Sequence, residues 1–200
     1  MATYNAIKYN VDYGGFAGAL IHIATFTSDG SDSNATFTSG IDSTYEEYLF
    51  IFNNIHPQTD NRGLRFIAST DGGSNYGVAT TSTAFQATHG EGDAGGALAY
   101  NTEHDAAQST SAISLISEQA NDSDLALSGY MRLYNPASTT FVKHFMCAGH
   151  NNASGGGGAD ASAHRLVAGY INTTSAVNAI KFDMASGEIQ GGTIQMFGVH

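Results

Sequence analysis

The side chains able to act as metal ligands or acid–base groups include eight histidines scattered along the chain. They are His22, His56, His89, His104, His144, His150, His164 and His200. No two of them are two or four residues apart, the spacings that put paired ligands on one face of a strand or helix. The spacing therefore predicts no metal site within a single chain, although one histidine from each of three chains meeting on an axis could bind a metal.

A second group of candidates is acidic. Asp93, Glu103 and Asp105 lie near one another in the sequence, and His104 stands between the last two. Strands can bring two carboxylates to the separation used in glycoside hydrolysis. Acidic residues in solvated loops account for the same pattern, and the sequence lacks the Gly-x-Ser-x-Gly, phosphate-loop and His-Glu-x-x-His motifs. We therefore predict no catalytic residues and no bound cofactor.

The sequence also disfavours calcium and thiol chemistry. Residues 29–34 (Asp-Gly-Ser-Asp-Ser-Asn) have the composition of a calcium loop. They lack the order and the closing glutamate of an EF-hand, so they predict an ordinary Asx turn. Cys147 is the only cysteine, which excludes an intrachain disulfide and a cysteine-based zinc site. It follows an apolar strand pattern, and we expect a buried small side chain rather than a nucleophile.

Composition places the chain among globular proteins with a neutral, hydrogen-bonding surface. Of its 200 residues, 42% are hydrophobic and only 12% are charged, about half the usual share. The net charge is −11, and the seven lysines and arginines form no cluster. Nucleic acid and anionic membrane surfaces are therefore not expected partners. The sequence shows no signal peptide and no bilayer-spanning apolar run, so we expect synthesis in a cytoplasm without membrane insertion.

The most apolar stretch, residues 44–56, organises the predicted fold. Its alternating apolar side chains are Tyr48, Phe50 and Phe52 on one side of an extended strand, and Leu49 and Ile51 on the other. A strand that is apolar on both sides is buried on both sides. One side can fill the core of the domain, and the other needs a second sheet, a loop or another subunit. We therefore predict that these five residues include an assembly face.

The whole sequence is predicted to form β-strands separated by turns, with no convincing helix. The predicted strands cover residues 19–26, 35–38, 44–55, 62–69, 76–88, 97–100, 106–120, 125–134, 139–148, 165–171, 176–184 and 192–199. A hairpin turn is predicted at 71–75. This spacing predicts an all-β, antiparallel sandwich of the jelly-roll type over residues 19–200. We prefer it to a closed barrel because a loop at 149–163 would cross between sheets. Residues 1–18 would form an N-terminal arm.

Two glycine-rich stretches, 89–96 and 149–163, predict exposed loops that could bind a partner. Their polar residues are His89, Glu91, Asp93, His150, Asn151, Asn152 and Asp160. The sequence also contains ten tyrosines and is rich in asparagine and serine, a composition that can bind sugars through ring faces and hydroxyl groups. Any polar β-protein shows the same composition, so sugar binding is an alternative and not the first interpretation.

Several ordered motifs resemble a module of virion structural proteins from marine tailed bacteriophages, often labelled tail-fibre or structural proteins. They are Ile41-Asp-Ser-Thr-Tyr45-x-x-Tyr48, Ile55-His-Pro57-x-Thr59-Asp60, Ser69-Thr-Asp-Gly-Gly-Ser74-x-Tyr76, Asn135-Pro-Ala-Ser-Thr-Thr-Phe-Val-Lys-His144, Gly169-Tyr-Ile-Asn-Thr-Thr-Ser-Ala-Val177-x-Ala179-Ile180 and Ser186-Gly187-x-Ile189-x-x-Gly192-Thr-Ile194. The resemblance covers residues 35–198. It implies a non-enzymatic, trimeric β-sandwich of the virion and supplies no catalytic residues.

The resemblance also sets expectations for location and partners. In the fibre proteins such a module follows an N-terminal anchor and shaft, whereas about 35 residues precede it here. We therefore expect a distal tip, a small appendage or a capsid-decoration protein, made in the host cytoplasm and carried on the virion surface. Its expected partners are two further copies of itself, other virion proteins and a host-surface glycan. The alternatives are a lectin-like sugar-binding module, calcium-assisted in one version, and a glycan depolymerase.

Overall fold

The computed structural model describes residues 20–93, 95–154 and 160–200, and within these ranges all regular structure is antiparallel β-strand. The strands are β1 (Leu20–Thr27), β2 (Ala35–Phe37), β3 (Glu47–Pro57), β4 (Arg62–Ser69), β5 (Thr80–Gly90), β6 (Ala97–Tyr100), β7 (Ala106–Ser109), β8 (Ile113–Gln119), β9 (Leu127–Tyr134), β10 (Lys143–Ser154), β11 (Asp160–Ile171), β12 (Ala179–Met184) and β13 (Ile189–Val199). These ranges contain no helix that could span a membrane. The predicted arm at 1–18 lies outside them.

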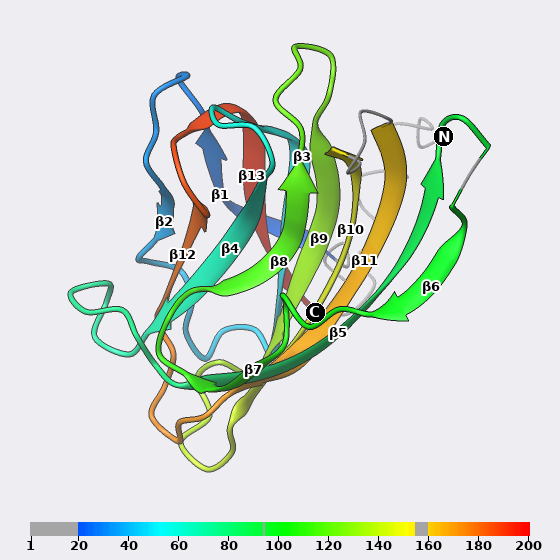
Figure 1. Ribbon diagram of the computed structural model, residues 1–200. Coiled ribbons are helices and arrows are strands. Elements are labelled where there is room, and N and C mark those ends of the chain that lie inside the picture. The colour runs from blue at the N-terminus through cyan, green and yellow to red at the C-terminus, as the bar shows by residue number, and fades with distance from the viewer. Residues whose placement is uncertain (1–19, 94, 155–159) are drawn as a thin grey trace, which may run out of the picture.

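Eight of the strands form a jelly roll of two four-stranded layers (Figure 1). One layer has the order β1-β13-β3-β9, and the other has the order β2-β12-β4-β8. The first and last strands of the chain are thus neighbours, as expected when a long antiparallel hairpin rolls up. At one edge the layers join where Ala153 of β10 pairs with Gln119 of β8. The prediction of an all-β antiparallel sandwich of jelly-roll type is confirmed.

Strand β3 lies near the middle of its layer, between β13 and β9. The register with β9 shifts between Phe52 and Ile55, and Asn54 adopts a left-handed φ of 50° at this bulge. Opposite the bulge, Gly192 has a φ of +98°, and a Cβ there would lie 2.4 Å from Asn54 O. Only glycine fits such an approach without strain. The strand ends at Pro57, as its missing N–H predicts.

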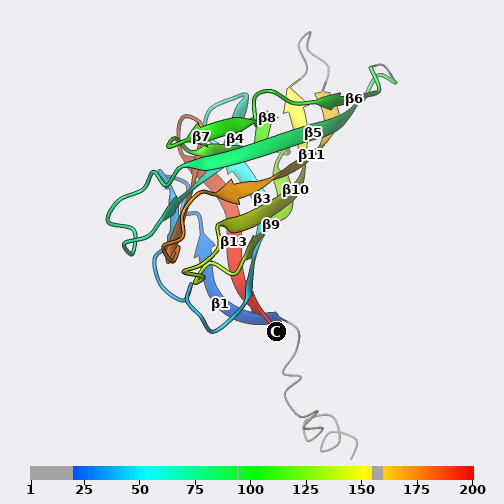
Figure 2. The same ribbon diagram turned by 90° about the horizontal axis from the view of Figure 1, so that it is seen from below.

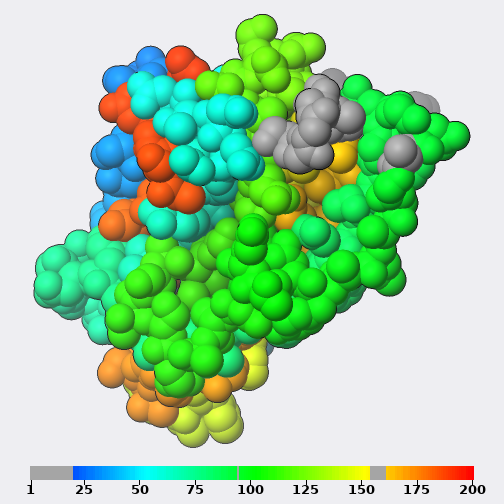
Figure 3. All heavy atoms as spheres, viewed as in Figure 1, coloured from blue at the N-terminus to red at the C-terminus, as the bar shows by residue number. Residues whose placement is uncertain are grey.

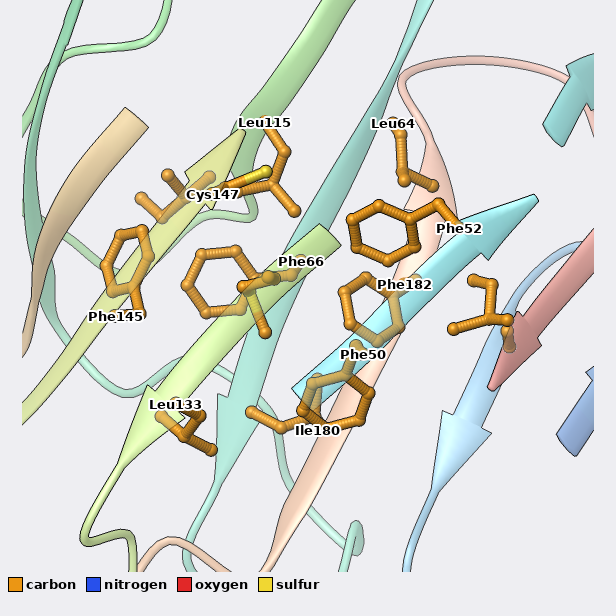
Figure 4. Packing of buried hydrophobic residues seen from close by; sticks show 14 of the residues in the cluster. Phe50, Phe52, Leu64, Phe66, Leu115, Leu133, Phe145, Cys147, Ile180 and Phe182 are labelled. Atoms are coloured by element: carbon orange, nitrogen blue, oxygen red, sulfur yellow. The ribbon is translucent and has the colours of Figure 1, made fainter. Parts of the chain in front are cut away.

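Aromatic contacts hold the two layers together (Figure 4). Phe182 of β12 meets Phe50 and Phe52 of β3 edge to face, with ring centroids 5.2 and 5.3 Å apart. Phe66 of β4 makes a similar contact with Phe145 of β10, at 4.7 Å. All five rings are at most 1% exposed. Edge-to-face packing of this kind adds to the burial energy and fixes the distance between the layers.

The layer β1-β13-β3-β9 continues beyond β9 through β10, β11 and β5. Strands β6 and β7 pair with the far edge of β5 (Figure 2). The β10–β11 pairing is long, running from Lys143↔Ile171 to Ser154↔Asp160. We call the layer from β1 through β13, β3, β9, β10 and β11 to β5 the large sheet. The part formed by β10, β11 and β5 is the extension.

The predicted loop at 149–163 is wrong over most of its length. Residues up to Ser154 belong to β10 and those from Asp160 belong to β11, so this segment is a hairpin and not a crossing between sheets. Asn151 and Ala153 are buried while His150 is exposed, an alternation typical of a strand despite the glycine content nearby.

Two smaller predictions are also corrected. The chain turns at 71–75 as expected, but β4 pairs with β8 and β12 while β5 pairs with β11, so the turn connects the two layers instead of closing a hairpin. The predicted strand at 106–120 is divided into β7 and β8. In both places the partner strand lies far along the chain, where local sequence gives no indication of it.

We expect Phe182→Ala to lower the free energy of unfolding by about 3–5 kcal/mol, because it removes the ring shared by Phe50 and Phe52 and leaves a cavity between the layers. Urea unfolding measures the loss. The control Phe141→Ala removes a ring that is 69% exposed, and its effect should stay within about 0.5 kcal/mol. Equal effects of the two substitutions would contradict this description of the core.

Candidate functional site

The outward surface of the large sheet carries two adjacent rows of mostly apolar side chains. Residues paired across strands project from the same side of a sheet, so the register defines these rows. The first row is Phe197, Leu49, Arg132, Met146, Ala168 and Thr83. The second row is Gln195, Ile51, Tyr130, Ala148, Leu166, Phe85 and Tyr100. We call the two rows together the apolar face; it runs from β13 to β5 and reaches β6.

Large side chains on the apolar face are open to solvent. Met146 is 53% exposed, Phe85 is 49% exposed and Tyr130 is 42% exposed. Phe85, Met146 and Leu166 border a hollow of about 170 Å³ between β10, β11 and β5. Exposed apolar residues that occur singly need no explanation, but a contiguous group of them marks an interaction site. The members of the apolar face are neighbours in the register, so this face is the candidate interaction site.

The apolar face carries almost no charge. Arg132 is the one charged residue in the two rows, and its guanidinium lies 2.5 Å from the carboxylate of Glu47 in the adjoining row. The guanidinium also lies 5.9 Å from the ring centre of Tyr130. The chain has 18 acidic residues, and none of them belongs to the two rows. An acidic partner therefore meets no like charge on this face.

The five residues of the predicted assembly face divide between the two sides of β3. Tyr48, Phe50 and Phe52 are at most 1% exposed and pack inside the domain, so they are not available to a second chain in this fold. Leu49 and Ile51 lie on the apolar face, where Leu49 is nearly covered by its neighbours and Ile51 is half-buried. The outward side of β3 is therefore the side that an assembly would use.

The two predicted binding loops are brought together at one end of the extension, because His89 of β5 pairs with Ser162 of β11. Glu91 and Asp93 lie in the turn between β5 and β6, and Asp93 approaches His89 at 3.6 Å. Much of the second predicted loop is strand. His150, Asn151 and Asn152 belong to β10, and Asp160 begins β11.

Asn151 is not a binding-loop residue, because it is completely buried. Its amide donates to Ser117 O at 2.9 Å, and its Oδ1 accepts from Arg165 Nε at 3.1 Å. His150 is exposed on the outward side of β10, and Asn152 is half-buried. Of this predicted loop, the outward positions of the hairpin are the ones that could contact a partner.

A cavity of about 460 Å³ lies on the opposite side of the molecule, between the start of β4, strand β8 and the segment 103–112. Figure 3 shows the green residues of the β5–β8 segment spread across this side. Glu103 and Asp105 line the cavity together with Glu118, and His104 contributes to its wall. Asp93 does not line it. The structure therefore groups two of the three predicted acids with the histidine between them.

Two ion pairs lie beside this cavity. Arg165, which is 1% exposed, donates from Nη2 to Glu118 at 2.6 Å and from Nη1 to Gln86. Arg65 donates from Nε to Asp183 at 2.9 Å. A buried guanidinium needs such partners because its desolvation is costly. The network connects β11, β8 and β5, so its primary effect is to fasten the extension to the jelly roll.

His104 belongs to the same buried region and is 2% exposed. Its Nδ1 lies 3.0 Å from Ser114 O, and because a carbonyl only accepts, Nδ1 carries the proton. Its Nε2 lies 2.8 Å from Ser117 Oγ. Burial, reinforced by the nearby Arg165 charge, lowers the pKa of His104 to about 4. The ring is therefore neutral at physiological pH.

The remaining residues that the sequence offers as candidates have structural roles. Cys147 is buried as predicted, and burial raises the pKa of its thiol. Asp29 accepts hydrogen bonds from the backbone N and the hydroxyl of Ser31, the pattern of an Asx turn. Among the described residues no group of three or more His, Cys, Asp and Glu side chains is placed to hold a metal ion.

Sequence reasoning missed the residues of the apolar face outside β3 and the pairing of Arg165 with Glu118. Tyr130, Met146 and Phe85 alternate with buried residues in their own strands, which is a usable local signal. These residues form one face only because of the order of the strands in the sheet, and the local sequence pattern does not reveal that order. A basic residue at an inward position, such as Arg165, does signal an acidic partner nearby.

Comparisons with protein-family models, with curated proteins and with solved structures find no match to this chain.

We expect the stability to fall as the pH is lowered from about 6.5 to about 4, because His104 must take up its proton in a buried site. A pKa difference of this size corresponds to about 3 kcal/mol. Urea unfolding at pH 7 and pH 4.5 measures the loss, and His104→Asn should reduce it. Asp71, whose pKa is about 2, contributes to stability until the pH falls below this interval, so its protonation does not affect the measurement. An unchanged pH dependence in the variant would contradict the assignment.

Proposed function

We propose that this chain is a non-enzymatic structural protein of a bacteriophage virion that assembles as a homotrimer through the apolar face. The observation that carries the proposal is the combination of exposed apolar side chains and the absence of acidic residues from the two rows of the apolar face, in a chain whose net charge is −11. Jelly rolls are a common architecture of viral capsid proteins, although a fold alone does not establish a function. The motif resemblance is the reason for proposing a virion protein and an assembly of three chains.

A second copy of the same chain fits the apolar face because of its charge. With a net charge of −11, two copies repel each other over most of their surfaces. Approach through the apolar face avoids this repulsion and buries Met146, Phe85 and Tyr130, which are the costly groups to leave in water. Most homo-oligomers have closed point-group symmetry, and a three-fold ring is the closed form that this proposal selects. Surfaces away from this face would then contact other virion proteins or the host.

Within the virion, the proposal allows two positions. On a tail or appendage, the end of the extension with His89, Glu91 and Asp93 would be exposed toward the host surface, where glycans are the expected ligands. On the capsid, the same protein would be a decoration component. Both positions use the same interface between copies, so the interface can be tested before the position is known.

The cavity beside β4 and β8 supports a second candidate function, sugar binding. It is lined by Glu103, Asp105 and Ser109, whose carboxylate and hydroxyl groups can hydrogen-bond to a polyol. Jelly rolls also occur in lectins. Binding to a glycan array that is lost in Glu103→Gln and Asp105→Asn would favour this function. It is compatible with a virion protein that is itself the receptor binder.

Met146→Glu and Phe85→Glu should each convert the trimer to monomer without unfolding it, because both side chains are exposed and each substitution places an acidic charge on the apolar face. Light scattering coupled to size-exclusion chromatography measures the mass, and circular dichroism checks the fold. The matched control is Thr36→Glu, at an exposed position of β2 in the other layer. A wild-type protein with the mass of one 20.9 kDa chain at micromolar concentration would refute the trimer.

Immunogold labelling of intact phage particles with antibody to this chain tests the virion assignment. Gold at the tail is expected for a fibre or appendage component, and gold over the shell is expected for a decoration protein. Particles that carry no gold, from a host in which the chain is expressed, would refute the virion proposal and favour the free sugar-binding module.

A further inference from the structure

A pair of histidines stands on the outward side of the extension, next to the apolar face. His150 of β10 and His164 of β11 are direct partners in the antiparallel register. Both side chains are exposed. Directly opposed residues have Cβ atoms about 4.5–5.5 Å apart and project to the same side of the sheet. The two imidazoles are 14 positions apart in the chain, which is why the spacing of the histidines along the sequence does not reveal them.

This separation suits a shared metal ion. Zinc binds imidazole nitrogen at about 2.0–2.1 Å, so two imidazoles bound to one ion have their nitrogens about 3 Å apart. Rings whose Cβ atoms are about 5 Å apart reach that distance by rotating their side chains, without a change in the backbone. The strands also hold the two Cβ atoms in place before the ion arrives, which lowers the entropic cost of binding.

We propose that His150 and His164 form a two-imidazole site for a borderline divalent cation such as Zn²⁺, Ni²⁺ or Cu²⁺. Neutral imidazoles prefer these ions, whereas Ca²⁺ and Mg²⁺ require carboxylate and carbonyl oxygens. The remaining coordination positions are open to water or to a group of an adjoining molecule. Both ligands come from one chain, so the site does not depend on the proposed trimer.

The residues that flank the pair carry no charge that would repel a cation. Across the sheet His150 is flanked by Ser128 of β9, and His164 is flanked by Ala87 of β5, both uncharged. His150 Nε2 lies 2.9 Å from Ser162 Oγ, a hydrogen bond that an ion can replace or that can orient the ring. The guanidinium of Arg132 on this side lies four residues along the strands from the row of the pair and is already paired with Glu47.

Binding should also stabilise the hairpin. The ion would connect β10 to β11 close to the turn between them, in addition to the backbone ladder. A ligand that binds the folded state and not the unfolded state raises the unfolding temperature in proportion to the logarithm of its concentration. The stability of the protein therefore provides a readout that is independent of direct binding measurements.

The test is isothermal titration of the untagged, metal-free protein with NiCl₂ and with ZnCl₂, together with thermal unfolding in the presence and absence of each ion. One ion should bind per chain. His150→Asn and His164→Asn should each weaken binding at least tenfold, roughly the loss expected for an altered metal site. The double variant should bind no more weakly than either single one, because each substitution alone destroys the chelate.

The matched control is His144→Asn. His144 is exposed on the same side of β10, but its partner across the ladder is Tyr170 and not a histidine. The control should keep the wild-type affinity and thermal shift, and CaCl₂ should produce neither signal in any variant. Equal binding by the wild type and the double variant would overturn the proposal, as would a wild-type protein that binds neither ion. These outcomes are independent of the oligomeric mass, which tests the trimer separately.

Discussion

The contact of Phe182 with Phe50 and Phe52 is the constraint on which the rest of the structure depends. Because successive side chains of a strand project to opposite sides, fixing these two rings inward also fixes Leu49 and Ile51 outward. The register then continues this orientation from β3 to its neighbours on both sides. The packing of the core therefore determines which residues the large sheet presents on its outward side, and a slip of one residue would exchange the two sets.

The extension adds a second requirement, because its inward side extends beyond the aromatic core. Polar and ionic groups fill this region: Arg165 bonds to Glu118, Asn151 and Gln86, and His104 bonds to Ser117. Such groups are costly to bury unless each has a partner, so they specify one arrangement of the extension more strictly than apolar packing does. Glu118 has a φ of 59°, an uncommon conformation that the network holds. The outward apolar face is consequently built on a rigid support.

The sequence predicts the parts of the fold that depend on local pattern. The alternation of Phe50 and Phe52 with Leu49 and Ile51, and the end of β3 at Pro57, follow from the side chains alone. The extension does not, because the pairing of β11 with β5 joins residues about 80 positions apart, as His164 and Ala87 show. The glycine-rich composition near Ser154 suggests a loop, whereas the ladder of a neighbouring strand is what decides the conformation. The ion pair of Arg165 and Glu118 is hidden for the same reason.

Two of the sequence motifs, at residues 41–48 and 69–76, contain hydrogen bonds that fix turns. Asp71 accepts hydrogen bonds from Asn75, Ser69 and the backbone of its own turn, and the bonds from Asn75 contribute most to lowering its pKa to about 2. The hydroxyl of Tyr48 donates to Asp42 O in another motif. Side chains whose donor and acceptor atoms bond within the turn fix its conformation, and few of these atoms remain to bind a ligand. These two motifs therefore stabilise turns of the jelly roll, whereas the apolar face and the histidine pair lie on outward positions of the strands, where side chains are free of such turn bonds.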